Sequence, residues 1–73
     1  MERVVGGTYP AKVTFRNDHG IFVDAGDYTI CLALKENLPE NFYENAKGGD
    51  PVMIRIIEID ERNRYRAEIL SVQ

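Results

Sequence analysis

Apolar and polar residues alternate along two stretches near the start of the chain, and this alternation predicts two β-strands. In the second stretch, residues 20–25, we expect Ile21, Val23 and Ala25 on the buried face and Phe22 on the solvent face. The Asn-Asp-His-Gly segment at residues 17–20 favours a turn and therefore a hairpin. The first stretch, residues 7–16, has an apolar side of Tyr9, Ala11, Val13 and Phe15 and a polar side of Lys12, Thr14 and Arg16.

The pattern next predicts a third strand at residues 28–34 and then one short helix. Alternation places Ile30, Leu32 and Leu34 on the core side of this strand and the smaller Thr29, Cys31 and Ala33 on the other. Apolar residues then recur at every fourth position, which is typical of a helix with a narrow apolar stripe. The stripe consists of Leu38, Phe42 and Ala46, with Pro39 and Glu40 suited to the first turn and Gly48 to the end.

Two more strands follow, at residues 51–60 and 64–72, separated by a polar turn. The apolar set of the first changes sides between Ile56 and Ile57, which predicts a β-bulge. In the second we expect Tyr65, Ala67 and Ile69 to point inward and Arg64, Arg66 and Glu68 outward. Three strands, a helix and two strands form the order of an all-β, five-stranded antiparallel OB-fold barrel, in which the helix between strands three and four closes one end.

Chain length indicates a single domain spanning residues 1–73, with a hydrophobic core of marginal size. The lone cysteine, Cys31, excludes an internal disulfide and cannot form a zinc site by itself. No apolar run approaches the ~18 residues of a membrane helix, and no secretion signal is apparent. We therefore expect a soluble, cytoplasmic monomer that does not associate with membranes.

The charge balance argues against a strong, non-specific binder of polyanions. Nine Lys and Arg residues face twelve Asp and Glu residues, for a net charge of -3. The charges are unevenly distributed, however, because Arg62, Arg64 and Arg66 cluster while acidic residues at 36, 40 and 44 occupy a separate segment. A local basic edge is therefore compatible with the acidic sum.

Five short segments, in order along the chain, carry a resemblance to a known family. They are Gly7-Thr8, Gly20-Ile21-Phe22-Val23-Asp24, Cys31-Leu32-Ala33-Leu34-Lys35-Glu36-Asn37-Leu38, Gly49-Asp50-Pro51-Val52 and Ile57-Glu58-Ile59-Asp60. Through them the chain, from about residue 6 to residue 70, resembles a divergent member of the RNA-binding OB-fold repeat of the ribosomal protein S-one. That repeat also occurs in ribonucleases, exosome subunits and translation factors.

The resemblance implies an RNA-binding face at His19, Phe22, Leu34, Asp60 and Arg64. Phe22, Asp60 and Arg64 match the family pattern, and the imidazole of His19, which replaces another aromatic ring, still stacks on a base. Leu34 replaces a histidine and removes a hydrogen-bonding ring. The resemblance implies that Leu34 is exposed, whereas alternation places it in the core. A bulge in strand three would be needed to reconcile these two positions of Leu34.

We expect a non-catalytic module that binds single-stranded RNA weakly and with low specificity, in translation or RNA processing. Aromatic rings stack on bases while cations attract phosphates, and we expect an aromatic and basic face on strands two and three, with cations supplied by Lys12, Arg64 and Arg66 from neighbouring segments. The candidate contact residues are Phe22, His19, Arg64, Asp60, Lys12, Arg66, Tyr28 and Leu34. The alternative is an OB-fold that docks on a ribosomal or RNA-processing protein and has lost RNA binding; a third is one domain of a larger nuclease or translation factor.

The inventory for other chemistry is thin. His19 lies near several aspartates, but their spacing matches no metal motif, so we expect no metal and no cofactor. Cys31 falls inside a strand and Ser71 near the end of the chain, and no glycine-rich phosphate loop occurs. These observations argue against an enzyme. Asp60 and Arg64 also have a purely structural interpretation, as an ion pair across a turn worth less than about 1 kcal/mol.

Overall fold

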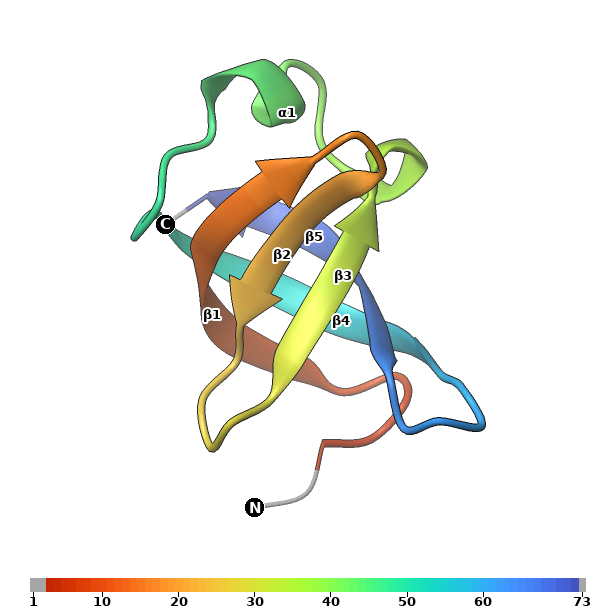
Figure 1. The fold of residues 1–73 in the computed structure, drawn as a ribbon. Helices are drawn as coiled ribbons and strands as arrows, with labels where there is room; N and C mark the ends of the chain where they lie inside the picture. Colours follow the sequence, from red (N-terminus) through yellow and green to blue (C-terminus); the bar gives the residue numbers. More distant parts are fainter. Residues whose placement is uncertain (1–2, 73) are drawn as a thin grey trace.

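The structure, a computed structural model, describes residues 3–72 and is a closed five-stranded barrel (Figure 1). Its order around the barrel is β1-β2-β3-β5-β4, and β1 closes the barrel by pairing with β4. All pairs are antiparallel except β3 with β5. This is the predicted OB-fold. Its elements are β1 (Thr8–Asn17), β2 (Gly20–Asp24), β3 (Ile30–Leu34), η1 (Lys35–Asn37), α1 (Phe42–Asn45), β4 (Pro51–Ile59) and β5 (Tyr65–Val72).

The core fills the inside of the barrel with small and medium-sized apolar side chains. The largest that are fully buried are Ile21, Ile54 and Ile56. The predicted inward sides of residues 21–25, 52–56 and 67–69 are confirmed, and the predicted hairpin joins β1 to β2. The core consists of Ala11, Val13, Ile21, Val23, Ala25, Cys31, Ala33, Phe42, Val52, Ile54, Ile56, Ala67 and Ile69.

The side chains of strand β3 face the opposite way from the prediction. Cys31 and Ala33 are fully buried, while Ile30 is 46% exposed and Leu32 and Leu34 are half-buried on the outer surface. A narrow barrel accounts for the inversion, because isoleucines and valines from β2 and β4 already fill its interior and leave room only for small side chains from β3. The strand also begins later than predicted, since Tyr28 lies in the preceding turn with a φ of 62° and is fully exposed.

Bulges in β1 and β4 affect which side chains reach the surface. In β1 the register shifts between Val13 and Phe15, so Phe15 is exposed instead of pointing inward as alternation predicted. In β4 the register shifts between Ile56 and Glu58, which confirms the predicted bulge and leaves Ile57 exposed while Ile59 packs against the core.

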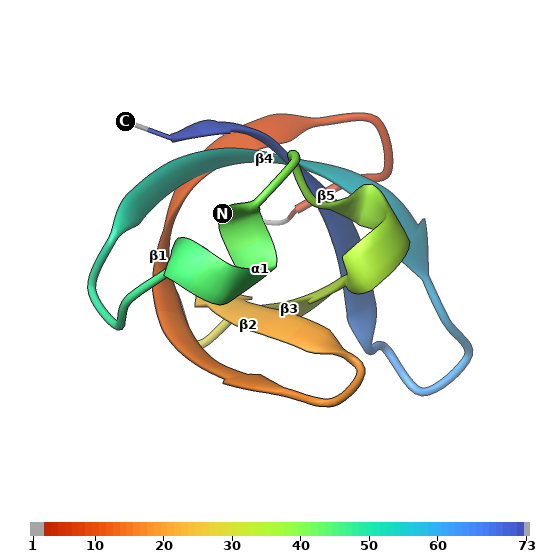
Figure 2. The same ribbon diagram turned by 90° about the horizontal axis from the view of Figure 1, so that it is seen from above.

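The predicted single helix is instead two short turns, η1 and α1, that cover one end of the barrel (Figure 2). Leu38 precedes a proline and is extended, and Asn41 has a φ of 65°, so a continuous helix is interrupted at both positions. Phe42 is buried at the barrel end, and Leu38 and Ala46 pack against the core. The three residues of the predicted stripe therefore contact the core as expected, although of these three only Phe42 lies within α1.

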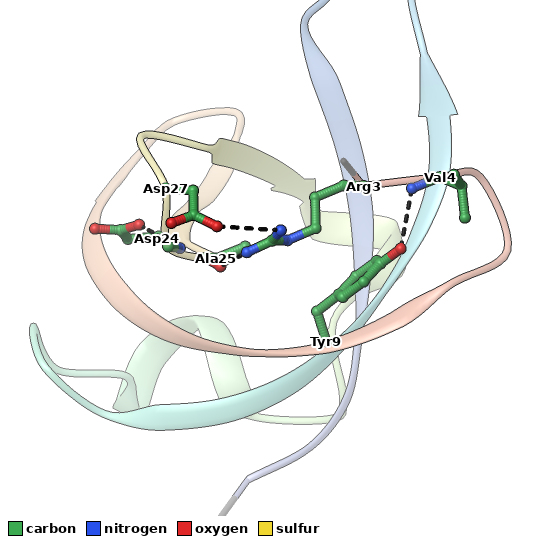
Figure 3. A network of polar contacts seen from close by, with 7 residues as sticks. Arg3, Val4, Tyr9, Asp24, Ala25 and Asp27 are labelled. Carbon is green, nitrogen blue, oxygen red and sulfur yellow. Dashed lines mark hydrogen bonds and ion pairs between the residues drawn. The ribbon is translucent and has the colours of Figure 1, made fainter. Parts of the chain in front are cut away.

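Arg3 closes the other side of the barrel, near the loop that joins β2 and β3 (Figure 3). Its side chain is only 9% exposed, lies 5.0 Å from the ring centre of Tyr9, and donates a hydrogen bond to the carbonyl oxygen of Ala25. The Arg3 guanidinium also lies 3.7 Å from the carboxylate of Asp27. Within residues 3–72 no helix has the length and apolar character that crossing a membrane requires.

Candidate functional site

A groove of about 770 Å³ runs along the outer surface of β3, between β2 and the start of β5. In Figure 1, β2 and β3 lie side by side on the near face of the barrel, and the beginning of β5 follows beside them. The turns before β2, before β3 and before β5 supply the rim. The residues that line the groove are His19, Phe22, Tyr28, Thr29, Ile30, Leu32, Leu34, Asn63, Arg64, Tyr65 and Arg66.

Aromatic side chains stand at both ends and in the middle of the groove. Phe22 is half-buried in the middle of β2, opposite Leu32, and His19 is exposed on the β1–β2 turn at one end. The side-chain oxygen of Asn17 fixes this turn by accepting hydrogen bonds from the backbone N–H groups of His19, at 2.8 Å, and Gly20, at 3.2 Å. Tyr28 is fully exposed at the other end. The groove therefore offers several ring faces to a ligand.

The aliphatic floor of the groove follows from the inverted orientation of β3. Ile30, Leu32 and Leu34 all face outward, and Leu34 lies opposite Gly20 in the β2–β3 ladder. The register between β2 and β3 is unbroken, so Leu34 reaches the surface without the bulge that we expected to be necessary. Its core position, predicted from alternation, was wrong, and the outward position implied by the family resemblance agrees with the structure.

Asp60 holds Arg64 in place at the rim. One carboxylate oxygen of Asp60 accepts hydrogen bonds from the backbone N–H groups of Arg64 and Arg62, at 2.8 and 2.9 Å. The other accepts a hydrogen bond from Nε of Arg64 at 2.8 Å. The backbone N–H of Arg64, together with its side chain and the N–H of Arg62, lowers the pKa of Asp60 below its usual value. Asp60 thus organises the turn while Arg64 faces the groove.

Charge is segregated in the groove. Among the residues that the structure describes, the lining includes Arg64, Arg66 and His19 but no aspartate or glutamate. The chain as a whole carries twelve acidic residues and a net charge of -3. The lining of the groove therefore differs in charge from the protein as a whole, although Asp60 lies directly behind Arg64.

Most of the predicted site residues come together, and one does not. Six of them, at positions 19, 22, 28, 34, 64 and 66, line the groove, and Asp60 supports it from behind. Lys12 lies outside, opposite Asp24 in the β1–β2 ladder. Sequence reasoning missed Phe15, which stacks on Phe22 with ring centres 4.7 Å apart, because regular alternation placed it inward. It also missed the lining residues Thr29, Ile30, Leu32, Asn63 and Tyr65.

The groups that suggest other chemistry are poorly placed for it. Cys31 is fully buried, and burial raises its pKa to about 11, so the thiol is protonated and unreactive near neutral pH. Residues 3–72 contain no group of three or more His, Cys, Asp or Glu side chains arranged to hold a metal ion.

Comparison with known proteins identifies the fold. No family model matches the chain, and no curated protein does. Among solved structures, the uncharacterized protein MJ1198 from Methanocaldococcus jannaschii superimposes with a TM-score of 0.85 at 20% identity, over 96% of each chain. GSP13 from Bacillus subtilis superimposes with a TM-score of 0.74 at 24% identity, over 93% of this chain and 55% of GSP13. These similarities establish a shared barrel architecture.

Proposed function

We propose that this domain binds single-stranded RNA, without catalysis, in the groove formed by β2, β3 and β5. The observation that carries the proposal is the composition of the groove: exposed rings and two arginines, with no carboxylate in the described lining. Bases stack on aromatic faces whatever their identity, and phosphates seek guanidinium groups. A role in translation or RNA processing agrees with the resemblance to the S-one repeat.

Three rings and one arginine of the groove have specific roles in this proposal. His19 stacks on a base at one end of the groove, Phe22 stacks in its middle, and Tyr28 stacks at the other end. Arg64 contacts a phosphate, and its hydrogen bond from Nε to Asp60 orders the side chain before the ligand arrives. Because one stacked base contributes roughly 1 to 3 kcal/mol and a few phosphate contacts add a salt-sensitive part, we expect micromolar or weaker affinity.

Leu34 makes the proposed binding less selective. An aliphatic side chain contacts the face of a base but cannot read its hydrogen-bonding edge, and Ile30 and Leu32 beside it have the same limit. We therefore expect similar affinity for short oligonucleotides of different sequence. Such a module contributes most when it is tethered to other binding domains.

The test is a titration of the ¹⁵N-labelled domain with a short single-stranded RNA at low and then moderate salt, followed by amide shifts. We expect shifts centred on the groove. Replacing Arg64 by Gln should reduce the slope of log K against log salt by about 0.7, the value for one phosphate contact on a single strand. The matched control is Arg62→Gln, which removes the same charge from the same turn but does not line the groove. Absence of shifts at millimolar RNA, or equal effects of both variants, contradicts the proposal.

A second candidate function is docking of an apolar segment from a ribosomal or RNA-processing protein. It is favoured by the aliphatic floor of the groove, where Ile30 is 46% exposed beside Leu32 and Leu34. Under this alternative, RNA produces no amide shifts, whereas the partner protein shifts Ile30, and Ile30→Ser weakens its binding. The same titration therefore separates the two candidates.

A further inference from the structure

An aromatic pair extends from the groove onto β1. Phe15 and Phe22 stack with their ring centres 4.7 Å apart and their planes 19° from parallel. Phe22 lines the groove, whereas Phe15 does not and is 57% exposed. In a stacked pair the inner faces cover each other, so the free face of Phe22 is on the groove side and the free face of Phe15 is on the β1 side.

The outward position of Phe15 depends on a specific local structure. The β1–β2 register shifts between Val13 and Phe15, which leaves Thr14 without a ladder partner. The Thr14 hydroxyl donates a hydrogen bond to the carbonyl oxygen of Phe22 at 3.0 Å, across the irregularity. Thr14, the residue in the bulge, therefore links the bulge to β2, the strand that carries Phe22. Bulges turn side chains to new directions, and this one turns an aromatic ring from the core to solvent.

The outer surface of β1 that carries Phe15 also carries Lys12, which lies opposite Asp24 of β2. Lys12 is exposed and is the outward-facing residue of β1 that comes before the bulge, between the buried Ala11 and Val13. Arg16, on the other side of Phe15 in the sequence, donates hydrogen bonds to the carbonyl oxygens of Tyr43 and Glu44, and is directed toward α1. Lys12 is therefore the basic side chain of β1 that is suited to a ligand lying on Phe15.

We propose that Phe15 is a second base-stacking position, and that bound RNA continues from the groove over the Phe22–Phe15 pair onto β1. One base stacks on the groove face of Phe22, a further base stacks on the free face of Phe15, and Lys12 contacts the phosphate between or beyond them. This inference rests on the proposed RNA binding. It gives Lys12 the phosphate-binding role predicted from the sequence, although Lys12 lies outside the groove.

The experiment measures the affinity of oligouridines from about three to about ten nucleotides long, a range that overlaps the ~4 to 16 nucleotides bound by single OB folds. Phe15→Leu removes the ring but keeps an apolar side chain against Phe22, and Phe15→Tyr keeps the ring. A matched control is Leu70→Ala, at another exposed apolar side chain that does not line the groove.

We expect Phe15→Leu to weaken the longer oligonucleotides about 5- to 10-fold, near the lower limit for one stacked base, and to leave the shortest unchanged. Its affinity should also stop rising at a length one nucleotide shorter than in the wild type. Phe15→Tyr and Leu70→Ala should behave as wild type.

Equal loss at every length would overturn the inference, because it would mean that Phe15 merely supports Phe22. Unchanged affinity at every length would also overturn it. In both cases RNA binding that remains sensitive to Arg64→Gln leaves the proposed function intact. If the wild-type domain binds no oligonucleotide, both the proposed function and the second stacking position are wrong.

Discussion

Gly20 is a position where the addition of a single methyl group would force the backbone of a neighbouring strand to move. It begins β2 and lies opposite Leu34 in β3. A Cβ atom there would lie 2.1 Å from the carbonyl oxygen of Ala33 and 2.9 Å from Cα of Leu34. Real Cβ atoms essentially never approach closer than 3.0 Å, so β3 must move by about 0.9 Å to accept an alanine. The obstacle is backbone, which cannot rotate out of the way.

We expect Gly20→Ala to destabilise the domain by about 3 to 5 kcal/mol. Overpacking costs roughly 1 to 3 kcal/mol, and weakening two ladder hydrogen bonds between β2 and β3 adds about 1 kcal/mol each. A domain of this size has a free energy of unfolding of roughly 4 to 11 kcal/mol. Since 1 kcal/mol shifts the Tm of such a domain by about 4 to 8 °C, thermal unfolding followed by circular dichroism should show a decrease of at least about 12 °C.

The matched control for this prediction is Gly48→Ala. Its Cβ would meet one atom, the carbonyl oxygen of Thr14 at 3.3 Å, and its φ is not positive, so we expect a change below about 1 kcal/mol. A Gly20→Ala Tm within about 4 °C of the wild type would refute the reasoning, because it would mean that β3 moves away at little cost. The same movement increases the distance between β2 and β3 at the Phe22–Leu32 pair, so RNA affinity should decrease even where the variant remains folded.

Two further predictions follow from titrating groups. The lowered pKa of Asp60 means that its interaction with Arg64 is fully present above the unfolded-state pKa of about 3.9 and is lost as pH falls through the lower folded-state value. A ¹³C carboxyl titration should give a midpoint below 3.9, and Asp60→Asn should abolish the pH response of the Arg64 amide; an ordinary midpoint contradicts this. Cys31, buried and with a pKa of about 11, should not react with a thiol reagent at about pH 8 until the domain is unfolded, and rapid reaction of the native protein would contradict its burial.

The sequence predicted the OB-fold correctly because its strongest patterns are the ones that the barrel uses. Val52, Ile54 and Ile56 alternate in a strand whose other side is less apolar, so their direction was unambiguous. The change of side at Ile57 predicted the bulge in β4 for the same reason. The polar turn from Asp60 to Arg64 was also recognisable, because a short carboxylate followed by donors favours such a turn.

Which side of β3 faces the core could not be predicted from the residues of β3 alone. Both of its sides are largely apolar, and ranking Leu32 and Leu34 above Cys31 and Ala33 by hydrophobicity gave the wrong face. What decides the direction is the volume left inside the barrel by β2 and β4, which is a property of strands distant in the sequence. Phe15 was misplaced for a different reason, because a bulge interrupts the alternation without any change in the local pattern.

The two departures from alternation, at β3 and at Phe15, are also the places that form the candidate binding surface. Because Cys31 and Ala33 face the core, Ile30 is exposed and Leu32 and Leu34 lie on the floor of the groove. The bulge in β1 exposes Phe15 beside Phe22. Each Å² of apolar surface that stays exposed leaves the fold without roughly 25 cal/mol of stabilisation. This loss is significant for a domain with a small core. A barrel with small side chains outside and the bulge removed would avoid that loss. The exposed rings and aliphatic groups, together with the nearby arginines, are therefore the features on which the proposed RNA binding rests.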